Sequence, residues 1–218
     1  MSNQPEKMIV GIDFDNTIVN YSYLLKRLAV EKGYVTERLG RSKKEIRDQI
    51  RQFPHGEIEW QKLQALMYGP RILEAEIFAG VMGFFCKCRK KKVRIAVISH
   101  KTEFAGYDST KTNLRTSALE WMEANNFFSP SGANMKQSEV FFLPTRKEKV
   151  AMIKKLGCTH FIDDLEETFQ ETEFPTNIMK VLFSPGDFES KVLEQNMVLC
   201  QNWAEVSKVL FATEVKEK

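Results

Sequence analysis

The sequence predicts an α/β protein, with a doubly wound parallel sheet and a small inserted helical subdomain. Three observations support this prediction. Short apolar runs rich in Val, Ile and Phe recur along the chain, and continuous rather than alternating runs suit strands covered on both faces. Helical patterns lie between several of these runs, as crossover connections require. Residues 18–92 contain no convincing strand, which indicates an insertion.

The apolar runs predict six strands. In chain order they cover residues 8–12, 93–98, 140–143, 159–162, 178–183 and 197–200. A helix at 114–125 follows the second run, and a helix at 147–156 carries Val150 and Ile153 at helical spacing. Gly157 is expected to end that helix as a C-terminal cap.

The strand-poor stretch offers four more helices. They cover residues 21–32, 43–52 with Ser42 as N-cap, 57–67 and 80–90. The last can return the chain to the second strand, but the others exceed what a simple crossover needs. We therefore predict a core of residues 1–20 and 85–218, with a helical insertion over residues 21–84.

Composition and charge exclude several classes of protein. The 218 residues are 43% hydrophobic and 28% charged, with a formal net charge of +3, which is typical of a soluble domain and gives no reason to expect nucleic acid or an anionic membrane as main partner. No apolar run approaches the roughly 20 residues that span a bilayer, and the run at 8–12 is too short for a signal peptide. A cytoplasmic location is expected, with Cys86, Cys88, Cys158 and Cys200 as free thiols.

Two pairs of carboxylates follow predicted strands directly. Asp13 and Asp15 come after the first strand, and Asp163 and Asp164 come at the end of the fourth. In an open parallel sheet, ligands bind beyond the carboxyl ends of the strands. Carboxylates that converge there repel one another, and a hard cation such as Mg²⁺ relieves the repulsion.

Two further segments supply groups that suit a phosphate. Ser99 and His100 end the second strand, and Lys147 and Lys149 lie at the start of a predicted helix. Phosphoryl transfer requires mainly positioning and neutralisation of charge on the phosphate oxygens. A hydroxyl, a lysine and Mg²⁺ provide both.

This combination resembles the phosphatase branch of the haloacid dehalogenase-like (HAD) superfamily. The resemblance rests on four motifs in order across residues 13–164: DFDNT at 13–17, ISH at 98–100, a lysine within RKEK at 146–149, and IDD at 162–164. It implies a Rossmann-like sheet with the first strand central, and it implies that the insertion is the superfamily's helical cap.

The resemblance also implies roles for the site residues. Asp13 would be the nucleophile that forms an aspartyl-phosphate, and Asp15 the general acid and base. Ser99 would bind a phosphate oxygen, with His100 and Thr17 as further phosphate-binding candidates. Mg²⁺ would be held by Asp13, by the backbone carbonyl of Asp15, and by the acidic pair Asp163 and Asp164.

Simpler roles remain open for some of these residues. Asp163 and Asp164 can form the N-cap of a helix at 165–169. Thr17 can bond only local backbone, and His100 can be a solvent-facing loop residue. For the motif lysine, Lys147 and Lys149 should face opposite ways, and we predict Lys147 because it begins the helix.

The sequence predicts a small phosphomonoester, such as a sugar phosphate or a nucleotide, as the substrate. A phosphomutase would use the same carboxylate pair, and a binding protein could keep the fold without turnover. A phosphatase acting on nucleic-acid ends is a more distant alternative, because an inserted cap should obstruct a polymer. The oligomeric state is not predicted.

Overall fold

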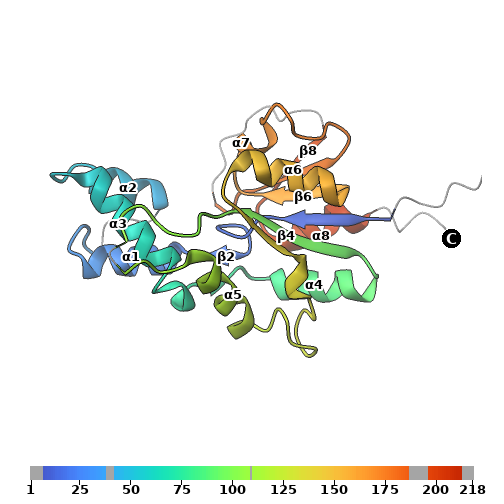
Figure 1. Cartoon of the computed structure of the whole chain (residues 1–218), viewed down its shortest axis with the longest axis horizontal. Coiled ribbons are helices and arrows are strands. Elements are labelled where there is room, and N and C mark those ends of the chain that lie inside the picture. The colour runs from blue at the N-terminus through green and yellow to red at the C-terminus, as the bar shows by residue number, and fades with distance from the viewer. Residues whose placement is uncertain (1–6, 38–41, 109, 187–195, 213–218) are drawn as a thin grey trace, which may run out of the picture. The chain divides into compact units, whose positions relative to one another are not determined.

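The computed structural model describes residues 7–37, 42–108, 110–186 and 196–212. The chain divides into two compact units (Figure 1). The core unit comprises Met1–Ile18, Phe78–His100 and Asn126–Lys218, and the helical unit comprises Val19–Ile77 and Lys101–Asn125.

The core unit is built on a parallel sheet whose order is β5-β4-β1-β6-β7-β8. These strands are β1 (Ile9–Ile12), β4 (Arg94–His100), β5 (Val140–Leu143), β6 (His160–Asp163), β7 (Met179–Phe183) and β8 (Met197–Cys200). All six predicted strands are confirmed. β1 is central, with Ile12 in register with Val97 of β4 on one side and Ile162 of β6 on the other. The carboxyl ends of these strands therefore lie at one edge of the sheet.

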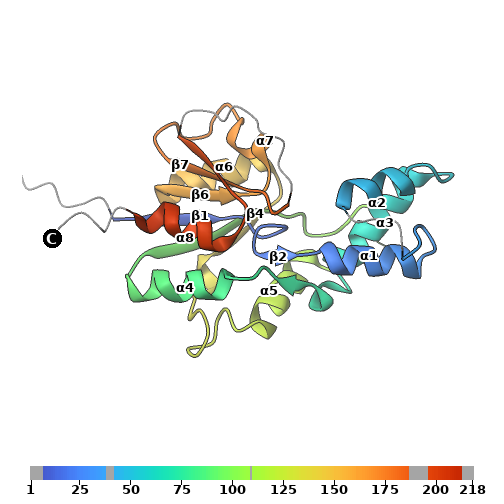
Figure 2. The same cartoon turned by 180° about the vertical axis from the view of Figure 1, so that it is seen from behind.

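Helices cover both faces of this sheet (Figures 1 and 2). They are α4 (Val81–Lys90), α6 (Arg146–Leu156), α7 (Glu166–Phe169) and α8 (Trp203–Phe211), with a 3-10 turn, η2 (Gln137–Glu139), before β5. α6 and α7 lie on one face, while α4 and α8 lie on the other, where the rings of Phe84 and Trp203 have centroids 5.0 Å apart. No helix within the described ranges has the length and apolar character that crossing a bilayer requires.

The helical unit contains every predicted helix of the insertion except the last. Its elements are β2 (Val19–Asn20), α1 (Ser22–Glu31), α2 (Lys43–Ile50), α3 (Gly56–Tyr68), η1 (Ile72–Glu74), β3 (Glu76–Ile77) and α5 (Leu114–Ala124). Ser42 caps α2 as predicted, because its hydroxyl accepts from the Glu45 amide while the Glu45 side chain accepts from the Ser42 amide. The prediction that residues 18–92 lack strands is wrong for β2 and β3, which pair antiparallel over two residues each.

The unit boundaries differ from those that the sequence predicts. α5 belongs to the helical unit, whereas its position after a core strand predicts a core helix. The buried indole of Trp121 in α5 donates to the carbonyl oxygen of Ala75 at 2.9 Å, which ties α5 to the end of the insertion. At the other boundary, residues 78–84 belong to the core unit because they lead into α4 and begin its crossover.

The ends of α4 and α6 differ in a way that affects stability. Gly157 follows α6 with φ of 64°, as predicted, but Lys92 occupies the corresponding position after α4 with φ of 57°. Left-handed backbone is costly for a residue with a Cβ. We expect Lys92→Gly to raise the free energy of unfolding by roughly 0.5–1 kcal/mol, because glycine relieves the backbone strain. The gain is smaller than the strain itself, because glycine also raises the conformational entropy of the unfolded chain. Urea denaturation measures this.

The matched control is Lys90→Gly, in the last turn of the same helix. It is expected to lower the free energy of unfolding by about 1 kcal/mol, because glycine is a poor helix former and relieves no strain there. A loss of stability in both variants would contradict the strain at Lys92.

Candidate active site

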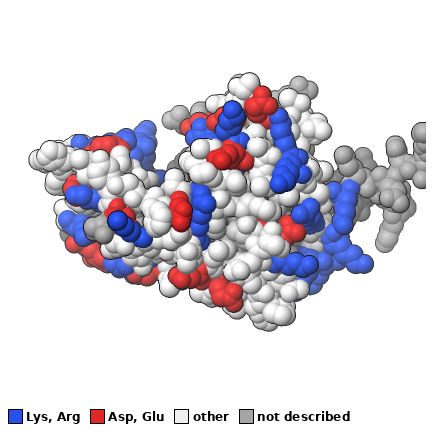
Figure 3. Space-filling model, in the orientation of Figure 1, with Lys and Arg blue, Asp and Glu red and all other residues white. Residues whose placement is uncertain are grey.

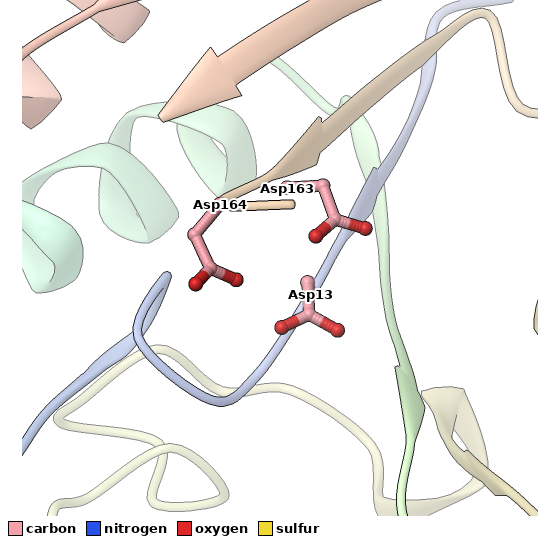
Figure 4. A group of neighbouring side chains, drawn as sticks. All are labelled: Asp13, Asp163 and Asp164. Atoms are coloured by element: carbon pink, nitrogen blue, oxygen red, sulfur yellow. The ribbon is translucent and has the colours of Figure 1, made fainter. Parts of the chain in front are cut away.

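The two acidic segments converge at the carboxyl edge of the sheet. Asp13 follows β1 directly, and its amide donates to the carbonyl oxygen of Ile162 in β6 at 2.8 Å. Asp163 ends β6, and Asp164 comes next. One carboxylate oxygen from each of Asp13, Asp163 and Asp164 lies within 4.8 Å of the others. Figure 4 shows the three side chains turned toward a shared space, so the predicted convergence is present for these three residues.

β1 and β6 pack closely just before the residues that converge. A Cβ atom at Gly11 would lie 2.5 Å from a ring carbon of Phe161 and 3.1 Å from Sγ of Cys158. Only glycine therefore allows β1 to pack against the Phe161 ring as it does. Gly11 and Phe161 each lie two residues before a site carboxylate, so this close packing lies next to the strand ends that carry Asp13 and Asp163.

A buried lysine joins the two strand ends. The ammonium of Lys149 lies 2.6 Å from Oδ1 of Asp13 and 2.6 Å from Oδ2 of Asp163. The Lys149 side chain is only 2% exposed. A cation shared by two buried carboxylates offsets their repulsion and holds both at fixed positions.

The prediction that Lys147 is the site lysine is wrong. Lys147 is exposed, whereas Lys149 is buried. Two residues turn about 200° around a helix, so the two side chains point in nearly opposite directions. Lys149 lies one turn before the buried Ile153 and therefore shares the face of α6 that packs on the sheet.

Burial dominates the ionisation of the nucleophile candidate. It raises the pKa of Asp13 to about 7, since the ammonium of Lys149 offsets only part of the desolvation and the carboxylates of Asp163 and Asp15 add to it. Burial alone would lower the pKa of Lys149, but the carboxylates of Asp13 and Asp163 raise it above its ordinary value. Lys149 is thus a permanent cation, while Asp13 can change charge near neutral pH.

Of the other predicted site residues, some are buried near the strand ends and others are exposed. Ser99 is 1% exposed near the end of β4, the neighbour of β1. His100 is exposed, and its Nε2 lies 3.0 Å from the carbonyl oxygen of Pro144. This contact favours the alternative that His100 is a surface residue. Asp15 is half-buried two residues beyond Asp13 and lies outside the cluster of three carboxylates.

Thr17 differs from the expectation that its hydroxyl bonds local backbone. Its side chain is fully buried, and Oγ1 has no hydrogen-bond partner among the described residues. The backbone carbonyl of Thr17 instead accepts from the indole of Trp203 at 3.2 Å. A buried hydroxyl without a hydrogen-bond partner is energetically costly, and a bound phosphate oxygen would supply such a partner. Phosphate binding by Thr17 therefore stays a prediction.

The carboxylates fit a hard divalent cation. Asp163 accepts the Leu165 amide on Oδ1 at 3.0 Å and Lys149 on Oδ2, so two donors orient it. Asp13, Asp163 and Asp164 offer oxygen ligands only, which Mg²⁺ prefers over nitrogen or sulfur. The prediction that Asp163 and Asp164 form the N-cap of the following helix is wrong, because the N-cap of α7 is Leu165 and no side chain caps it.

Many solved structures have a similar fold, although no family model and no curated protein matches the sequence. A HAD-superfamily hydrolase of subfamily IA from Geobacter sulfurreducens is 13% identical, with a TM-score of 0.54 over 96% of this chain and 100% of its own. The chain has the HAD-superfamily fold. The putative HAD-hydrolase YfnB from Bacillus subtilis, described as bound to magnesium, is 10% identical, with a TM-score of 0.54 over 94% of this chain and 99% of its own.

The chain is also similar in fold to a protein described by a different activity. Protein tyrosine kinase A from Mycobacterium tuberculosis is 13% identical, with a TM-score of 0.59 over 95% of this chain and 100% of its own. Identities this low establish a shared architecture. The resemblance to the HAD superfamily that the four motifs predict is therefore confirmed as fold.

Proposed function

We propose that this HAD-fold protein is a Mg²⁺-dependent phosphatase that hydrolyses a small phosphomonoester through an aspartyl-phosphate. The contact between the buried Asp13 and Lys149, beside two further carboxylates, is the observation that carries the proposal. It combines a nucleophile, a permanent cation and a set of hard oxygen ligands. An exposed acidic turn would have neither the burial nor the lysine.

Asp13 acts as the nucleophile in the proposed reaction. One of its carboxylate oxygens bonds to phosphorus as the bond from phosphorus to the substrate's ester oxygen breaks. Asp15 donates a proton to that leaving oxygen and then removes one from the water that hydrolyses the aspartyl-phosphate. Inorganic phosphate leaves, and Asp13 and Asp15 return to their starting forms.

Lys149 and Ser99 support this reaction without changing covalently. Lys149 stabilises the ionised form of Asp13 and neutralises charge on the phosphate oxygens. The Ser99 hydroxyl donates to one of these oxygens. Asp13, Asp163 and the backbone carbonyl of Asp15 would hold Mg²⁺, with Asp164 assisting directly or through water. The ion supplies charge neutralisation between nucleophile and phosphate.

The substrate proposed is a sugar phosphate, a nucleotide or a similar cytoplasmic metabolite. In this proposal the helical unit is the cap that selects the leaving group. Phosphate release from a panel of monoesters, with and without Mg²⁺, tests the function. No release from any ester by pure protein with Mg²⁺ would favour a binding protein of the same fold. Release of an isomerised sugar phosphate in place of free phosphate would indicate a mutase.

Magnesium should stabilise the protein, and the effect should depend on pH. Because the pKa of Asp13 is raised to about 7, Mg²⁺ must displace a proton from it below that pH. We expect the apparent dissociation constant for Mg²⁺ to rise nearly tenfold per pH unit below about 7 and to level off above it. The rise in melting temperature with Mg²⁺ concentration, at pH 6, 7 and 8, measures this.

Two variants control for nonspecific effects of the ion. Asp163→Asn should remove the stabilisation by Mg²⁺, because it removes a charged ligand from the buried cluster. Glu173→Gln, on the exposed partner of Lys154, should keep it. Equal stabilisation in both variants, or none of the expected pH dependence in the unmodified chain, would contradict this site.

A further inference from the structure

A cavity of about 230 Å³ lies in the core unit at the amino end of β4, away from the acidic cluster. Its walls come from the last turns of α4, the first residues of β4 and the segment 133–139. Arg94, which begins β4, lines it, whereas Ser99 lies five residues further along the strand, about 16 Å away at the usual rise per residue. The cavity is therefore separate from the proposed active site.

The charged side chains around the cavity are mostly cationic. Arg89, Arg94 and Lys136 line it together with a single carboxylate, Glu139. Glu139 pairs with Arg94, with Nη2 and Oε2 3.1 Å apart. Arg89 donates to two neutral backbone carbonyls of the loop 130–132, at 2.9 and 3.1 Å, so its charge is not cancelled. Lys136 is exposed, and the described part of the chain gives it no ion pair. The cavity therefore carries a net positive charge.

Helix electrostatics account for only part of this charge. Cations are favoured in the last turn of a helix, which explains Arg89. Lys136 and Arg94 come from a loop and a strand, and nothing in the helix requires them. Figure 3 shows Lys and Arg side chains gathered over the end of the core unit where α4 meets β4. A positive electrostatic field attracts anions to a pocket that lies within it.

The inner wall of the cavity is apolar. Phe85, 2% exposed, and the half-buried Met135 line it. We propose that this cavity binds a small organic phosphate or phosphonate, with the anion beside Arg89 and Lys136 and an apolar ring against Phe85 and Met135. Such pairing of an apolar wall with a few charged groups is typical of small-molecule sites.

Phenylphosphonate is a suitable probe, because it joins an anion to a ring and has no ester bond to hydrolyse. Titration into ¹⁵N-labelled protein with a chelator present should shift the amide signals of Ile95, Met135 and Lys136. Inorganic phosphate, which lacks the ring, should shift the same signals with an affinity at least about fivefold weaker.

Charge variants of opposite sign give the decisive comparison. Lys136→Glu should weaken binding by at least about fivefold, and Glu139→Gln should tighten it by about twofold while keeping a hydrogen-bonding partner for Arg94. Lys155→Glu, at an exposed position on α6, should leave the affinity unchanged. If these residues only stabilised the fold, Lys136→Glu and Glu139→Gln would not change the affinity in opposite directions.

Other outcomes would overturn the proposal. Shifts confined to residues 13–17 and 163–165 would assign the binding to the acidic edge. Equal weakening by Lys136→Glu and Lys155→Glu would indicate general attraction to a basic protein. If a 20-nucleotide single-stranded RNA moved the signals of residues 89–95 while phenylphosphonate did not, the basic surface would be a polyanion site and the cavity would play no part.

Discussion

Asp13→Asn is expected to lower phosphate release with Mg²⁺ by about 10⁴-fold or more, the largest effect of any single change. The amide keeps the volume of the carboxylate but has no anionic oxygen to attack phosphorus. It also removes one of the charged ligands of the proposed ion. Steady-state kinetics on the best substrate of the panel measure the loss. A rate near that of the unmodified chain would rule out the covalent mechanism.

The same variant should fold at least as well as the unmodified chain. The pKa of Asp13 is raised to about 7 by burial, so at pH 8 the folded protein carries an unfavourable buried charge that Asn lacks. Urea denaturation with a chelator at pH 8 should therefore show an equal or higher free energy of unfolding for Asp13→Asn. This advantage should shrink as the pH falls from 7 toward 4, where the folded carboxyl is already protonated and the unfolded one is not. A collapse of stability would make the kinetic result uninterpretable.

Lys149→Met is expected to lower turnover by roughly 10²–10³-fold and to destabilise the fold by about 3–5 kcal/mol. The substitution keeps most of the apolar stem but removes the ammonium that lies 2.6 Å from both Asp13 and Asp163. Two buried carboxylates then face each other without their cation. Added Mg²⁺ should restore part of the stability, because it also neutralises them. Denaturation with and without Mg²⁺ separates these contributions.

Lys147→Met is the matched control, on the same helix and with the same change in chemistry. Because Lys147 is exposed, we expect turnover within about twofold of the unmodified chain and stability within about 0.5 kcal/mol. A large loss of activity in this variant, with Lys149→Met active, would contradict the placement of the lysine in the structure. The two variants together test the site without reference to any relative.

The sequence predicts the sheet well because its signals are local. Each strand is a compact apolar run, and Asp13 and Asp163 stand where such runs end. The rule that ligands gather at the carboxyl edge of a parallel sheet then brings distant acidic residues together. The capping signals at Ser42 and Gly157 are likewise read from a few adjacent residues, and both are confirmed.

The errors concern which surface a segment faces. The helical pattern of residues 114–125 shows that one face is buried but not what covers it, so the bond from Trp121 to Ala75 could not be predicted. β2 and β3, with two residues each, are too short to show any periodicity. The lysine choice was recoverable: Lys149 lies four residues before Ile153, on the apolar stripe, and its long stem lets a second-turn residue reach the strand ends.

The tight contact at Gly11 links the proposed catalytic site to the packing of the hydrophobic interior. The Phe161 ring occupies the space that a side chain at position 11 would need, and both residues are linked to site carboxylates by two steps of backbone. An added methyl group there would have to displace the Phe161 ring or the strand itself, close to the residues that carry Asp13 and Asp163, without altering any reacting atom. Position 11 therefore affects the proposed chemistry through packing alone, because glycine has no side chain that could take part in the reaction.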